Sequence, residues 1–133
     1  MQMIGKLGAT ALILAVLFPV TPALAKTISK TVAPGRASNI DHYTGWNNDC
    51  SFMVIKIDVA TKPAHGSVST RITNGRIAAH ADIGSAGTCA GKPTKVLNLY
   101  YKPAPGYHGS DSFSVNMSSG GSPQSYYYEI TVR

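Results

Sequence analysis

The chain has 133 residues, 12 of them Lys or Arg and 6 Asp or Glu, which gives a formal charge of +6. This length suits a single domain and excludes a two-domain enzyme with a cleft between its halves. Only 14% of the residues are charged, whereas Gly, Pro and Tyr are plentiful, so short strands and turns are favoured over helices.

Residues 1–25 have the pattern of a cleavable export signal. One basic residue, Lys6, precedes an apolar stretch over residues 7–20, and alanines occupy the two positions that a signal peptidase inspects. The apolar stretch is shorter than the ~20 residues that span a bilayer. We therefore expect a mature domain of residues 26–133, with 11 basic and 6 acidic residues and a charge of +5. The protein is expected to be exported, to the periplasm or beyond the cell.

Apolar and polar residues alternate with a period of two along the mature chain, as strands with one buried face require. The alternation is clear at 111–118, where Phe113, Val115 and Met117 oppose polar residues, and it recurs at 125–132. Such short strands predict an antiparallel, all-β sandwich or barrel. The expected seven strands, with an eighth candidate at the end, are 27–32, 37–42, 51–59, 66–73, 76–82, 95–102, 111–118 and 125–132.

Turn residues separate these segments. Asn74 and Gly75 form a dipeptide that favours a two-residue hairpin, because both central residues of that turn take positive φ. Pro34 and Gly35 are expected to end the first strand. Residues 119–123 (SGGSP) are expected to join the last two strands as a second hairpin.

Cys50 and Cys89 are the two cysteines of the chain. In an exported protein an even pair is expected to form a disulfide. Neither cysteine has a second Cys or a His at metal-ligand spacing, which argues against a metal site. A bridge between them closes 39 residues, and such a loop stabilises the fold by about 4 kcal/mol in the chain-entropy estimate.

Two segments carry a recognisable pattern, residues 62–68 (KPAHGSV) and residues 101–113 (YKPAPGYHGSDSF). They resemble the bacterial immunoglobulin-like or cadherin-like domains that occur in tandem in large surface and secreted proteins. The resemblance runs from about residue 50 to the C-terminus. It implies an immunoglobulin-like (Greek-key) sandwich of about seven to eight strands, and a role in adhesion, spacing or recognition without catalysis.

The residues of the second motif have evident structural roles. Asp111 is expected to cap the backbone of a turn, and Phe113 to enter the core. Tyr107 is expected to pack across the corner with its hydroxyl on the backbone. The chain departs from the family in being a single copy and in lacking the clustered acidic residues that bind calcium. No calcium and no other cofactor are therefore predicted.

Catalytic patterns are weak. A Ser-His-Asp set can be assembled from Ser110 or Ser112 with His108 and Asp111, but neighbours along a strand point to opposite faces. No HExxH or nucleophile-elbow motif is present. A small hydrolase using His65 or His108 remains the alternative to a non-catalytic domain. The four histidines fit no zinc spacing: His42, His65, His80 and His108.

The aromatic residues suggest where a ligand would bind. Tyr43 and Trp46 lie in a polar loop beside Asn47 and Asn48, and a ring beside amides suits sugar recognition. The competing interpretation places Trp46 over the disulfide as part of the core. Tyr127 is the middle residue of three consecutive tyrosines and is the one expected to be exposed.

The positive charge is expected to attract acidic surfaces, but the basic residues are spread and no run of four occurs. Nucleic acid and stable membrane insertion are therefore not predicted. The expected function is that of a binding or structural module of the bacterial envelope or extracellular space, whose partner is a polysaccharide or another protein. An enzyme inhibitor that uses the loop from His42 to Asp49 is a further alternative.

Overall fold

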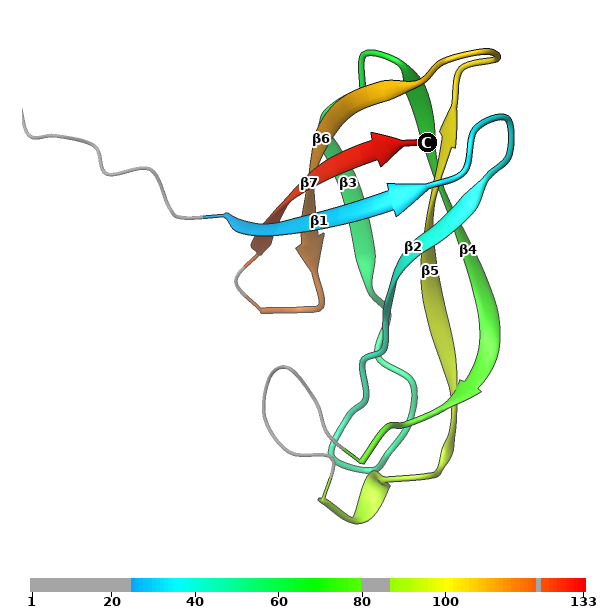
Figure 1. Ribbon diagram of the computed structural model, residues 1–133. Coiled ribbons are helices and arrows are strands. Elements are labelled where there is room, and N and C mark those ends of the chain that lie inside the picture. The colour runs from blue at the N-terminus through cyan, green and yellow to red at the C-terminus, as the bar shows by residue number, and fades with distance from the viewer. Residues whose placement is uncertain (1–24, 80–86, 122) are drawn as a thin grey trace, which may run out of the picture.

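The computed structural model describes residues 25–79, 87–121 and 123–133. These residues form seven β-strands, one 3-10 turn and no α-helix (Figure 1). The elements are β1 (Lys26–Val32), β2 (Ser38–Tyr43), β3 (Lys56–Thr61), β4 (Gly66–Arg76), η1 (Gly87–Cys89), β5 (Pro93–Pro103), β6 (Gly109–Ser118) and β7 (Gln124–Val132).

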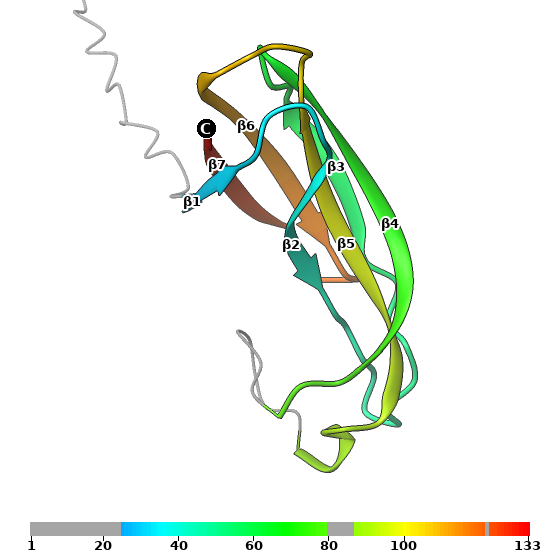
Figure 2. The same ribbon diagram turned by 45° about the vertical axis from the view of Figure 1, so that its right-hand side comes forward.

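The strands of the described residues form two sheets, with the orders β1-β7-β6-β3 and β2-β5-β4. Figure 2 shows the two sheets as the layers of an open sandwich. Three connections, residues 33–37, 62–65 and 104–108, lie at the upper end of Figure 1, whereas residues 44–55 and η1 lie at the lower end. The expected all-β sandwich is confirmed, and so is the antiparallel pairing of β6 with β7.

The pairing of β1 with β7 is parallel, which differs from the purely antiparallel arrangement that the strand pattern predicts. The physical reason is that β1 is followed by a strand of the other sheet. Because no tight turn connects β1 to β7, nothing forces them into opposite directions. The backbone N–H of Arg133 donates to the carbonyl of Val32 at 3.1 Å and extends this pairing by one residue.

The hairpin predicted at Asn74 and Gly75 is wrong. β4 continues through both residues, which pair with Lys95 and Thr94 of β5. Gly75 instead allows a close approach, because a Cβ built on it would lie 2.5 Å from Cγ2 of Val96. The strand predicted at 76–82 consequently does not form in its described part, since β4 ends at Arg76. The strand predicted at 51–59 begins only at Lys56.

The core lies between the sheets and is built from alternate residues of the central strands. Tyr101 of β5, Phe113 of β6 and Tyr128 of β7 stack in series, with ring centroids 6.1 Å and 4.9 Å apart. All three rings are fully buried, and Phe113 enters the core as expected. Their buried apolar neighbours on the same three strands are Leu97, Leu99, Val115, Met117, Tyr126, Ile130 and Val132.

The predicted disulfide between Cys50 and Cys89 is present, with Cα atoms 5.3 Å apart. It joins the connection between β2 and β3 to η1 at the lower end of the sandwich (Figure 1). Cys89 and Ile77 form a small second apolar cluster there, against which Trp46 and Cys50 pack. The bridge therefore stabilises the lower end of the sandwich, whose small apolar cluster is separate from the main core.

Gly66, the glycine of the first motif, is required by close packing. A Cβ at this position would lie 2.6 Å from the carbonyl oxygen of Lys102 and 2.7 Å from the ring of Tyr101. We expect Gly66→Ala to lower the free energy of unfolding by about 2 kcal/mol, because backbone and a buried ring cannot both move aside. Chemical denaturation measures the change. Gly121→Ala, whose Cβ meets no atom within 4 Å, is the control and should change stability by less than about 0.5 kcal/mol.

Candidate functional site

Tyr43 is half-buried and packs against the main core. Its hydroxyl pairs with the hydroxyl of Tyr128, which in turn donates to Oδ2 of Asp41 at 2.7 Å. Its ring also contacts Tyr126 at 5.6 Å between centroids. Burial raises the pKa of Tyr43 above its ordinary value, and the neighbouring Asp41 adds to the shift. This network links β2 to β7, which belong to different sheets.

Trp46 packs against the disulfide cluster, as its structural interpretation expects. It is half-buried, and its backbone forms an isolated bridge with Phe52. Asn47 and Asn48 are exposed beside it, and Nδ2 of Asn47 donates to Oγ of Ser51 at 2.9 Å. Trp46 thus packs on the disulfide cluster, whereas Tyr43 packs against the main core.

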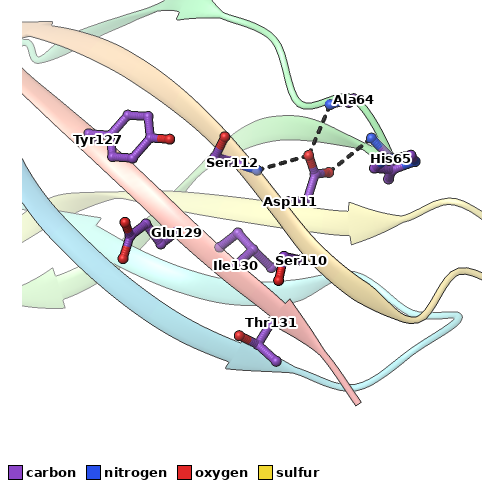
Figure 3. Close-up of a pocket in the computed structure, with 9 residues that line it drawn as sticks. All are labelled: Ala64, His65, Ser110, Asp111, Ser112, Tyr127, Glu129, Ile130 and Thr131. Carbon is purple, nitrogen blue, oxygen red and sulfur yellow. Dashed lines mark hydrogen bonds between the residues drawn. The ribbon is translucent and has the colours of Figure 1, made fainter.

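Tyr127 lies on the outer face of the four-stranded sheet, whereas Tyr126 and Tyr128 face the core. This confirms the alternation expected for the three tyrosines. Its side chain borders a shallow hollow of about 500 Å³ that spans β6 and β7 (Figure 3). The lining residues are Ala64, His65, Ser110, Asp111, Ser112, Tyr127, Glu129, Ile130 and Thr131.

Hydroxyl groups surround Tyr127 and Glu129 because of the strand register. Ser114 is the cross-strand partner of Tyr127, and Ser112 is the partner of Glu129. On the other side, Oγ of Ser29 on β1 donates to Oε2 of Glu129 at 3.0 Å. The surface thus offers one aromatic ring, one carboxylate and several hydroxyls on paired strands.

Asp111 closes one end of the hollow and is the most heavily bonded carboxylate among the described residues. Its Oδ1 accepts from the backbone N–H groups of Ala64 at 3.0 Å and Ser112 at 2.8 Å. Its Oδ2 accepts from the N–H of His65 at 3.0 Å and from Oη of Tyr101 at 2.7 Å. Figure 3 shows the three backbone contacts as dashed lines. Asp111 thus caps a turn as predicted, and the capped turn is the connection between β3 and β4.

These hydrogen bonds decide the ionisation of Asp111. Burial alone would raise the pKa of its carboxyl, but the bonds from Tyr101 and the backbone outweigh burial and hold the pKa below its ordinary value. Burial, together with the hydrogen bond and charge of Asp111, raises the pKa of Tyr101 in turn. The carboxylate is thus ionised and the phenol neutral at physiological pH.

His65 and the hydroxyls of Ser110 and Ser112 line the same hollow as Asp111. The imidazole of His65 stacks on the ring of Tyr107 with centroids 4.1 Å apart, and the hydroxyl of Tyr107 donates to the carbonyl of Ser110. The expected corner role of Tyr107 is thereby confirmed. Asp111 uses both carboxylate oxygens on the fold, so it braces the backbone and does not orient an imidazole.

The remaining histidines add no cluster. His42 and His108 are exposed, and His80 lies outside the described residues. Among the residues that the structure describes, no group of three or more His, Cys, Asp or Glu side chains is placed to hold a metal ion. The same part of the chain contains no helix long and apolar enough to cross a membrane. The expected export signal, residues 1–25, lies outside the described residues except for Ala25.

The outward hydroxyls and Glu129 were not among the site residues that the sequence suggests. A signal for them exists, because serines recur at every second position from Ser110 to Ser114 while apolar residues alternate with them from Phe113 onwards. Such a run indicates a hydroxyl-bearing outer face. The sequence does not indicate which strands lie beside it, and the hollow depends on those neighbours.

No protein-family model matches the chain, and neither a curated protein nor a solved structure is significantly similar to it. Function must therefore be argued from the geometry of the surface itself.

Asp111→Asn tests the carboxylate brace. We expect the variant to lose about 2–3 kcal/mol of unfolding free energy at pH 7, since an amide cannot accept four hydrogen bonds. The folded pKa of Asp111 lies below the unfolded value, so its stabilisation is present above about pH 4 and disappears as the pH falls through the folded pKa. Urea unfolding between pH 7 and pH 2 should therefore show a flatter acid dependence in the variant. Equal acid dependence of both proteins, with the exposed Asp58→Asn as control, would contradict the assignment.

Proposed function

We propose that the protein is an exported, non-catalytic binding module with an immunoglobulin-like sandwich, which recognises a polysaccharide of the bacterial envelope through the hollow at Tyr127. The observation that carries the proposal is the combination of an outward ring, a carboxylate and paired hydroxyls on one rigid sheet. Carbohydrate sites use an aromatic face against the apolar side of a sugar ring, with polar groups that bond its hydroxyls.

The strand order supports the immunoglobulin-like part of the proposal. In such domains the second, fifth and fourth strands share one sheet, and the third, sixth and seventh share the other. The six strands β2 to β7 follow that order, whereas β1 lies beside β7 and not in the sheet of β2. The residues of the second motif also have the expected structural roles, with Asp111 on the backbone and Phe113 in the core.

Two features support export. The Cys50–Cys89 disulfide is of a kind that persists in oxidising compartments. Residues 1–25 have the sequence pattern of a secretory signal. Polysaccharides are abundant in the compartment that such a protein would enter, which suits the chemistry of the hollow.

Tyr127→Ala tests the proposed site. We expect the variant to bind purified envelope polysaccharide about tenfold more weakly, because the loss of one stacked ring corresponds to about 1.4 kcal/mol. Co-sedimentation in low and high salt measures the affinity. The contribution of the ring should survive high salt, since it does not arise from charge.

Two further variants complete this experiment. Tyr127→Phe keeps the ring and should retain most of the affinity. Trp46→Ala should lower stability and leave affinity unchanged, because Trp46 packs on the disulfide cluster. Undiminished binding by Tyr127→Ala would place the site elsewhere. If the folded domain binds no polysaccharide but captures a specific protein, that protein replaces the polysaccharide as the ligand.

A further inference from the structure

The basic residues are spread along the sequence, but the fold gathers four of them on the strands of the three-stranded sheet. The described strands of this sheet carry Arg71, Arg76, Lys95 and Lys102. Asp41 is the acidic residue on the same strands, and it points between the sheets, where it accepts a hydrogen bond from Tyr128. The described strands of the four-stranded sheet instead carry three basic and three acidic residues. The two sheets therefore differ in charge.

Strand register places two of the cations on the outer face. Arg71 pairs with Asn98 and Lys102 with Ser67, positions that alternate with the buried Leu97, Leu99 and Tyr101. His42 pairs with Asn98 from the other side, so it lies in one row with Arg71. Arg71, Lys102 and His42 are all exposed. No acidic side chain faces outward from the described strands of this sheet.

Polar contacts order the surface between these cations. The guanidinium of Arg71 lies over the ring of Tyr100, 5.6 Å from its centroid. Nδ2 of Asn39 donates to Oδ1 of Asn98 at 2.9 Å, and Nδ2 of Asn98 donates to Oγ1 of Thr73 at 2.9 Å. Asn98 is buried, so this chain of amides is a built feature of the face. An ordered cation loses less freedom when it binds an anion.

From this placement we propose that the outer face of the β2-β5-β4 sheet binds an acidic polysaccharide. Lys102 is four residues along β5 from the row of Arg71, which corresponds to about 13 Å between the rows. Two cations at that distance cannot clamp one carboxylate, but they match a polymer that carries charges at intervals. The face between them offers amides and hydroxyls, the groups that bond sugar hydroxyls.

The same chemistry argues against the two other common anionic partners. A membrane-binding surface needs several apolar side chains to enter the lipid, and the outward neighbours of Arg71 are polar apart from Val96 and the ring of Tyr100. Single-stranded nucleic acid binds through several stacked aromatic rings, whereas Tyr100 and His42 are the rings on the described outer face, and Arg71 already covers Tyr100.

The inference does not depend on the site at Tyr127, because the two surfaces lie on opposite sheets. The β2-β5-β4 face is a second surface, and the charge of its ligand is specified in addition to the proposed function. Failure of either proposal would consequently leave the other standing.

The test is a double variant, Arg71→Gln with Lys102→Gln, in the otherwise intact chain. Its probes are polygalacturonate, which carries carboxylates, dextran sulfate, which carries sulfates, and neutral dextran. We expect wild-type protein to bind both acidic polymers and not dextran, and the double variant to bind them about tenfold more weakly at 0.1 M salt, as the loss of two exposed ion pairs implies. Titration calorimetry or affinity electrophoresis measures the change.

The matched control is Lys56→Gln with Arg133→Gln, which also removes two positive charges, one from β3 of the four-stranded sheet and one from the exposed residue that follows β7. It should reduce affinity less than twofold. Equal losses in both double variants would overturn the proposal, because net charge alone would then explain binding. Tighter binding to a DNA oligonucleotide or to anionic phospholipid vesicles than to the acidic polysaccharides would also overturn it. Thermal melting verifies that all variants are folded.

Discussion

The hydrogen bonds of one buried carboxylate determine how the upper end of the sandwich is arranged. Asp111, near the start of β6, accepts from the backbone of Ala64 and His65 in the connection between β3 and β4. It also accepts from Tyr101 at the end of β5. One strand of each sheet and the connection between β3 and β4 are thereby held by one carboxylate. Gly66 can follow directly because no side chain separates it from Tyr101. Residues of both sequence motifs therefore take part in a single brace.

The opposite end depends on a covalent bond, and the middle on stacked rings. Cys50 and Cys89 tie the lower connections together, while Tyr101, Phe113 and Tyr128 fill the space between the sheets. With both ends fixed, outward side chains keep constant spacing along and across the strands. Preorganised surfaces of this kind bind with a smaller entropic cost than flexible loops. This favours recognition on the sheet faces, and it distinguishes Tyr127 from the loop residues Asn47 and Asn48.

Local sequence patterns predicted most of the strands, but the pairing of the strands determines which side chains share a surface. Alternation identified the inward residues of β6 and β7, and the cysteine pair and the capping by Asp111 followed from chemistry that acts over short distances. The Asn74-Gly75 hairpin failed because β4 gains ladder hydrogen bonds by continuing along β5, and because Gly75 accommodates Val96 rather than a turn. No local pattern places Arg71 beside Tyr100, since their proximity depends on the register of two strands that are distant in sequence.

The difference between the two faces follows from the same alternation that builds the core. On each strand most apolar residues face the interior, and the remaining residues form the solvent face. The solvent face carries hydroxyls around Glu129 on one sheet, and cations and amides on the other. The sheets of a sandwich pack about 10 Å apart. Groups on opposite outer faces therefore lie farther apart than a Debye length at physiological salt, about 8 Å, and influence each other weakly. The two proposed surfaces are therefore expected to bind their ligands with nearly additive free energies.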